Sequence, residues 1–141
     1  MANGSDRLDG ILQIAESKEN SAAAVYSKLK QDWDFNREKL EELRAFRDEY
    51  HGSTGAQTAD RFQSTRQFLS QLSAAIDQQE MQVEQLLHKV QSTEAEWTDQ
   101  RRKRMSVEKA IEKRGHKRDQ QQARLEQNIL DEISHRPPSG V

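Results

Sequence analysis

Apolar residues recur at alternating intervals of four and three along most of this chain, and the pattern is interrupted only once. From Leu8 to Tyr50 it occupies thirteen positions, of which ten are apolar or aromatic. The spacing averages about 3.5 residues, which is the period of a left-handed coiled coil. A second run with the same spacing starts at Phe62 and continues, more weakly, to Leu125. The sequence therefore predicts two long helices whose apolar stripes meet along a seam.

The prediction is an all-α protein in which two long helices form an antiparallel coiled-coil hairpin, the second helix being the longer. Residues 1–141 form a single coiled-coil domain in this interpretation. Helix one covers about 5–51, the turn about 52–58, helix two about 59–135 and the tail 136–141. The seam of helix one uses Leu8, Leu12, Ala15, Glu19, Ala22, Tyr26, Leu29, Trp33, Asn36, Leu40, Leu43, Arg47 and Tyr50. The seam of helix two uses Phe62, Thr65, Leu69, Leu72, Ile76, Gln79, Val83, Leu86, Val90, Thr93, Trp97 and Gln100, and then weaker positions from Arg104 to Leu125.

The reversal of the chain is predicted from its turn residues. We expect Gly52 to end helix one in the left-handed conformation that glycine adopts readily, and Gly55 to loosen the loop. Thr58 or Asp60 then caps helix two. The two prolines at 137–138 end it, because proline disfavours helix in the residue before it.

A fold-back at this turn also predicts a register. Tyr50 is expected beside Phe62, and Leu8 is then expected to reach Arg104 on helix two. Residues 106–135 would have no intrachain partner, and a lone helix with a thin apolar stripe is marginal in water. We therefore expect this overhang to dock on a partner, and weak pairing with a second copy of the chain is one option.

Composition argues against catalysis and against cofactors. Of the 141 residues, 33% are hydrophobic and 33% are charged, which suits solvated helices better than a globular core with a pocket. The chain has no cysteine, and its four histidines lie far apart, so neither thiol chemistry nor a metal site is expected. The N-terminus does not resemble a signal peptide, and no apolar run is long enough for a membrane span.

Positive charge is concentrated in one short segment. The net charge is -2, yet residues 101–118 carry nine basic and two acidic side chains. Three interpretations apply: a basic helix on nucleic acid, a contact with an acidic protein surface, or a solvated helix face. Aromatic residues for base stacking are not interleaved with the run, and its position on the overhang favours the protein contact. The candidate contact residues are Arg101, Arg102, Lys103, Arg104, Lys109 and Lys113.

A second stripe follows the turn. Phe68, Leu72, Ala75 and Gln79 are spaced by four, three and four residues and so share one face of helix two. Phe68 lies one residue off the seam, at an outer position. Its ring either packs under the loop or anchors a partner.

These features resemble the FliJ family of the flagellar type III export apparatus. The similarity is strongest over residues 46–79, and it includes Trp97 followed by the basic cluster 101–104 and the ending LDEISHR at 130–136. The matching residues in the first of these segments are Glu49–Tyr50, Arg61–Phe62, Gln67–Phe68, Leu72 and Ala75–Ile76.

The resemblance implies a non-enzymatic protein similar to the central stalk of rotary ATPases. It implies that the chain ends insert into the hexameric export ATPase (FliI) and promote ring assembly, and that the export-gate protein FlhA is contacted at Phe68, Leu72, Ala75 and Gln79. At the last of these positions the family carries a histidine. It also implies binding of export chaperones and a cytoplasmic location, peripheral to the inner membrane at the flagellar base. The equivalent stalk protein of a virulence secretion system is the alternative, and a nucleic-acid-binding coiled coil is another.

Overall fold

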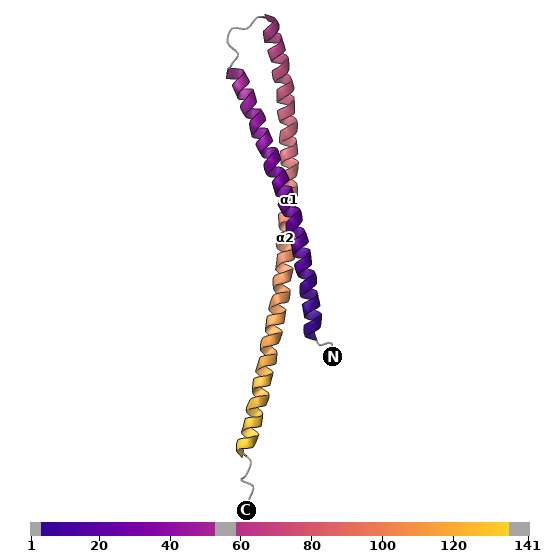
Figure 1. Cartoon of the computed structure of the whole chain (residues 1–141), viewed down its shortest axis with the longest axis vertical. Helices are drawn as coiled ribbons and strands as arrows, with labels where there is room; N and C mark the ends of the chain where they lie inside the picture. Colours follow the sequence, from indigo (N-terminus) through magenta and orange to yellow (C-terminus); the bar gives the residue numbers. More distant parts are fainter. Residues whose placement is uncertain (1–3, 53–58, 136–141) are drawn as a thin grey trace, which may run out of the picture. The chain divides into compact units, whose positions relative to one another are not determined.

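The computed structural model describes residues 4–52 and 59–135, and this part of the chain consists of two α-helices (Figure 1). α1 spans Gly4–Gly52 and α2 spans Ala59–His135, 49 and 77 residues long. They pack against each other as an antiparallel hairpin, and no strand occurs among the described residues. The predicted fold class and the greater length of the second helix are confirmed.

The helix ends agree with the expected ends to within one residue, but the expected conformation of Gly52 is wrong. This glycine is the last residue of α1 and is helical, so it does not form a left-handed cap. Gly55 and Thr58, which were expected to loosen the turn and to cap α2, lie outside the described residues. Asp60 is in the first turn of α2, where its carboxylate suits the positive end of the helix dipole.

The seam follows the predicted heptads closely. All thirteen predicted positions of α1, from Leu8 to Tyr50, are buried or half-buried. The predicted positions of α2 are also buried or half-buried from Thr65 to Ile111, whereas Phe62 is 61% exposed. Apolar spacing alone therefore identified which face of each helix packs, because only residues at this period meet the partner helix repeatedly.

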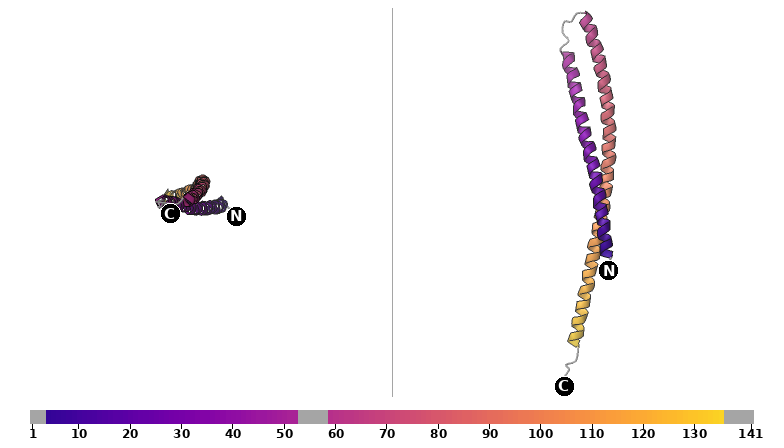
Figure 2. Two further views of the ribbon diagram at one scale, coloured as in Figure 1. Left: turned by 90° about the horizontal axis from the view of Figure 1, so that it is seen from above. Right: turned by 45° about the vertical axis from the view of Figure 1, so that its right-hand side comes forward.

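The contacts divide the chain into two packed parts, which are described separately: residues 20–99, and residues up to 19 together with those from 100 onward. In residues 20–99, α1 and α2 lie side by side in Figure 1 and in the right-hand view of Figure 2. Their core is Leu40, Leu72 and Ile76, with Leu43 and Val83 packed against it. Ile76 is only 1% exposed, so truncation to alanine here is expected to cost about 2–5 kcal/mol.

Two further layers fix how α1 is aligned with α2 within residues 20–99. The Gln79 side-chain amide donates hydrogen bonds to the Asn36 backbone oxygen (2.9 Å) and to its Oδ1 (3.0 Å). Tyr26 stacks on Trp97 with ring centroids 5.3 Å apart. Tyr50 contacts Phe68, at 4.8 Å, rather than Phe62.

The predicted register is therefore wrong: Tyr50 lies beside a residue six positions further along α2 than expected. The second packed part is shifted in the same direction: Arg104 forms an ion pair with Glu19, eleven residues along α1 from Leu8, which was its expected neighbour. A slip of seven residues leaves every seam position on the seam, so the heptad spacing could not distinguish the two alignments.

The shift lengthens the segment of α2 that α1 covers. Val107 and Ile111 are half-buried, as are Leu8 and Leu12 near the start of α1. Every residue from 112 to 135 is exposed. The unpaired segment thus begins at about residue 112 and not at 106, and the rest of the expectation, a long solvated extension of α2, is confirmed.

Candidate partner-binding surfaces

Three aromatic rings gather beside the turn, two from α1 and one from α2. Phe68 meets Phe46 edge to face at 6.1 Å and Tyr50 at 4.8 Å, and Phe46 lies 6.3 Å from Tyr50. Phe68 nevertheless remains 36% exposed, and Phe46 remains 47% exposed. The outer face of the Phe68 ring is therefore available to a partner. The alternative expectation, that the Phe68 ring packs under the loop, concerns residues 53–58, which lie outside the described part of the chain.

The other members of the predicted stripe do not share this exposure. Leu72 belongs to the hairpin core and is 8% exposed, and the Gln79 amide is directed inward to Asn36. Ala75 faces outward. The stripe is therefore divided: Phe68 and Ala75 present surface, and Leu72 and Gln79 hold the helix beneath them.

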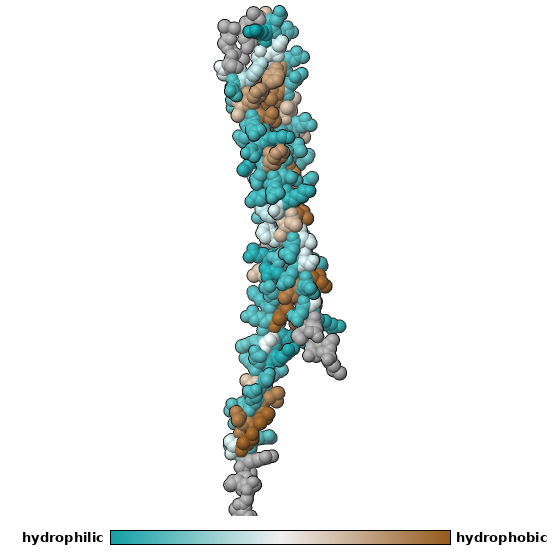
Figure 3. Space-filling view, viewed as in Figure 1, coloured by the Kyte–Doolittle hydropathy of each residue, from teal (hydrophilic) through white to brown (hydrophobic). Residues whose placement is uncertain are grey.

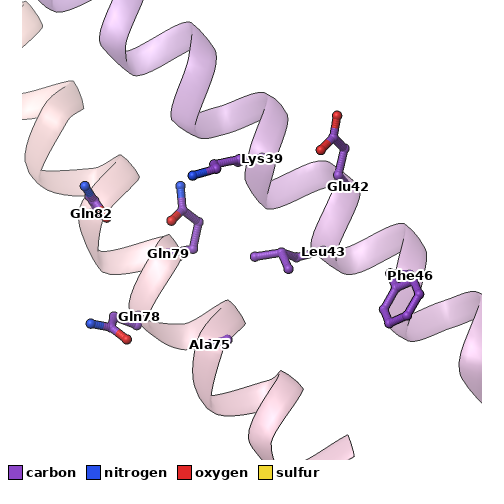
Figure 4. Close-up of a pocket in the computed structure, with 8 residues that line it drawn as sticks. All are labelled: Lys39, Glu42, Leu43, Phe46, Ala75, Gln78, Gln79 and Gln82. Carbon is purple, nitrogen blue, oxygen red and sulfur yellow. The ribbon is translucent and has the colours of Figure 1, made fainter.

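A shallow groove of about 670 Å³ lies between the helices beside Ala75 (Figure 4). α1 contributes half of its lining, which the predicted site on α2 alone did not include. Phe46 could have predicted this contribution from the sequence, because it is an apolar residue one position before the seam and widens the apolar stripe of α1. The groove is lined by Lys39, Glu42, Leu43, Phe46, Ala75, Gln78, Gln79 and Gln82.

The opposite flank of the same seam is occupied by ion pairs. Arg44 binds Glu80 on α2 at 2.9 Å and Glu41 on α1 at 3.1 Å. The hydrogen bond to the Glu80 carboxylate raises the pKa of the Arg44 guanidinium. The two sides of the hairpin therefore differ in chemistry along this stretch.

Among the predicted basic contact residues, which begin at Arg101, one faces the other helix of the hairpin and the others face solvent. Arg104 is half-buried, pairs with Glu19 across the hairpin, and binds Glu108 at 2.8 Å. The hydrogen bond to the Glu19 carboxylate raises the pKa of the Arg104 guanidinium. The other predicted contact residues are exposed: Arg101, Arg102, Lys103, Lys109 and Lys113.

The exposed segment of α2 carries two surfaces in succession. The first is a basic hollow of about 550 Å³ bordered by Lys113, Arg114 and Lys117. In its lining, the Nε2 atoms of His116 and Gln120 lie 3.3 Å apart. The second is apolar and appears near the end of α2 in Figure 3. Its residues are Leu125, Ile129, Leu130 and Ile133, each 55–62% exposed. The sequence analysis included only Leu125, although the spacing of Leu125, Ile129 and Ile133 by four predicts one shared helix face.

The described residues were searched for two further features, a cluster of metal-ligating side chains and a membrane-spanning helix. Within it, no group of three or more histidine, cysteine, aspartate or glutamate side chains is placed to hold a metal ion. In the same residues, neither helix combines the length and the apolar composition that a membrane crossing needs.

Two long helices that pack as a hairpin along a heptad seam define a coiled-coil protein. The chain matches the family model described as "Flagellar FliJ protein" over residues 4–139. It belongs to the FliJ family, a non-catalytic stalk component of the flagellar protein export apparatus. No match to a curated protein was found.

Proposed function

We propose that this protein links the export ATPase ring (FliI) to the export-gate protein FlhA and promotes assembly and activity of the ring. The observation that supports this most is that α2 continues past the hairpin as residues 112–135, fully exposed, first basic and then apolar. An isolated helix of this kind is marginal in water and gains stability by docking. In this proposal the protein is cytoplasmic, lies peripherally at the inner membrane at the flagellar base, and also binds export chaperones.

We assign the gate contact to the stripe Phe68, Leu72, Ala75 and Gln79, with two kinds of role. Phe68 and Ala75 touch the gate protein, because they are the members of the stripe that present surface. Leu72 and Gln79 position them from the hairpin interior.

Alanine at Phe68 tests the gate contact. We expect the affinity for purified gate protein to fall about tenfold, since a partly exposed aromatic is a typical anchor at an interface. Met81→Ala is the matched control, because Met81 is also on α2, is 62% exposed and lies off the stripe. Circular dichroism verifies that both variants keep wild-type helicity. Unchanged gate affinity in folded Phe68→Ala protein would remove the assignment.

For the ATPase ring we assign the contact to Arg101, Arg102, Lys103, Lys109 and Lys113, with Arg104 acting as a positioning residue through its pair with Glu19. Lys109→Glu/Lys113→Glu should lower the stimulation of ATPase activity, because it reverses two exposed charges. Lys28→Glu/Lys89→Glu makes the same change at exposed sites between residues 20 and 99. Equal stimulation by the two double variants would contradict this assignment.

A further inference from the structure

We propose that the exposed segment of α2, residues 112–135, pairs with the same segment of a second copy of this chain, antiparallel and centred on Leu125. Every residue of this segment is exposed, and its large apolar side chains are each 55–62% exposed. Weak pairing with a second copy was one option expected for this overhang, and the charge pattern gives it a direction and an alignment. Such a pair forms without the export ATPase and so does not rest on the proposed function.

Positive and negative charges are separated along this segment. Residues 113–118 carry four basic side chains and no acidic one, whereas residues 126–132 carry three acidic side chains and no basic one. An antiparallel partner brings its acidic half against the basic half of the first chain, and two-fold symmetry repeats the contact. A parallel partner in register would place like charges side by side in both halves. The charge pattern therefore favours the antiparallel direction.

Two charged pairs set the alignment. The basic pair 117–118 and the acidic pair 131–132 are separated by fourteen residues, which is two heptads. Arg118, Leu125 and Glu132 are thus spaced by seven residues and share one face of the helix. When two copies pair about Leu125, Arg118 of each lies opposite Glu132 of the other. Lys117 of each then lies beside Asp131 of the other.

These charges are not arranged for pairing along their own helix. Opposite charges on a helix surface pair at intervals of three or four residues. At those intervals the basic pair 117–118 meets only uncharged residues and the like charges of Lys113 and Arg114, which destabilise the helix. Among the described residues, the acidic pair 131–132 meets no lysine or arginine at those intervals. A second copy provides the opposite charges that this segment lacks.

Apolar side chains occupy the middle of the pair. Leu125 is 62% exposed, and it meets Leu125 of the second copy at the two-fold axis. Ile133 lies opposite Lys117 of the second copy, whose aliphatic stem covers it while the ammonium group reaches Asp131. The apolar surface near the end of α2 in Figure 3 is thereby removed from water.

The length of the exposed segment suits this pair. Ile111 is half-buried in the hairpin, and α2 ends at His135. Pairing about Leu125 uses residues 115–135 of each copy, all of which are exposed, over about 30 Å of helix. The hairpin already holds the preceding turns of α2 in helical form, so the pair does not have to nucleate a helix.

Analytical ultracentrifugation of the full chain tests the pair. The wild type should pass from monomer to dimer between about 1 µM and about 1 mM, because the contact is small. Lys117→Glu/Arg118→Glu should weaken the dimer about tenfold or more, since it places like charges opposite each other. Lys28→Glu/Lys89→Glu is the matched control, with the same change of charge at exposed sites between residues 20 and 99. Circular dichroism verifies the helicity of both variants.

Exchange of the two charged pairs tests the alignment. Lys117→Glu/Arg118→Glu/Asp131→Lys/Glu132→Arg restores opposite charges at the facing positions, so this fourfold variant should dimerise as the wild type does. A structural effect of the two basic side chains alone would not be rescued by changes at 131–132. In a parallel pair, the twofold variant would bind as the wild type does, because like charges would remain beside like charges.

Single cysteines test the direction. The chain has no cysteine, and Gln121 lies opposite Ile129 of the second copy in the antiparallel pair. A chain with Gln121→Cys should therefore form a disulfide with a chain that carries Ile129→Cys, and not with itself. Disulfides between two Gln121→Cys chains in place of the mixed disulfide would overturn the antiparallel direction.

Three further results would overturn the pair. The first is a wild-type chain that stays monomeric over this range, including a monomer that binds anionic lipid vesicles and so has a membrane surface as its partner. The second is equal association of the twofold variant and its matched control. The third is a fourfold variant that associates no better than the twofold variant.

Discussion

At the scale of single residues, the hairpin itself uses several side chains that sequence reasoning assigned to partners. Leu72 is core, Gln79 is hydrogen-bonded to Asn36, and Arg104 is paired with Glu19. All three occupy seam positions, and a seam residue faces the other helix before it can face anything else. Phe68 and Ala75 lie off the seam and keep exposed surface.

The two helix-interior glycines should respond differently to alanine. A Cβ added at Gly10 or at Gly115 meets nothing within 4 Å, and both residues are helical. Gly10→Ala should raise the free energy of unfolding by about 1 kcal/mol, because alanine has the higher helix propensity. Gly115 lies in the uncovered segment, so Gly115→Ala should raise helicity at 222 nm without moving the main melting transition. A higher melting temperature for Gly115→Ala would show that this segment packs in the isolated chain.

At the scale of elements, the seam was predictable and the alignment of its two halves was not. Heptad spacing identifies the buried face of each helix, since burial recurs every 3.5 residues. A slip of one heptad preserves that face, so the alignment depends on particular layers. Here these are the Asn36–Gln79 hydrogen bonds and the Tyr26–Trp97 stack.

The polar layer at Asn36 and Gln79 gives a double-mutant prediction. Gln79→Leu removes the amide that donates a hydrogen bond to Asn36 Oδ1. Loss of this hydrogen bond should lower the free energy of unfolding by about 1 kcal/mol. Asn36→Leu/Gln79→Leu makes the layer apolar and should be at least as stable as wild type. Thermal melts of both single variants and the double variant provide the coupling energy. Additive effects would show that the hydrogen bonds do not couple the two residues.

At the scale of the whole molecule, the sequence predicted the surfaces that lie on one helix and missed the one that needs two. The basic run on α2 and the exposure of Phe68 follow from spacing and charge along a single helix. The groove beside Ala75 depends on which part of α1 lies opposite, and that requires the register. The predicted limit of the overhang was wrong for the same reason.

The central claim is that the hairpin and the extension of α2 bind different partners. A chain that stops after Ile111 tests it directly, because every residue from 112 to 135 is exposed and the seam is kept. This truncated chain should retain the wild-type melting temperature and gate affinity but stimulate the export ATPase less than wild type, because it keeps the basic residues up to Lys109 and lacks Lys113 and the rest of the exposed segment 112–135. Phe68→Ala should weaken gate binding and leave the stimulation unchanged. Full ATPase stimulation by the truncated chain, or loss of gate binding from it while the hairpin remains folded, would contradict the account.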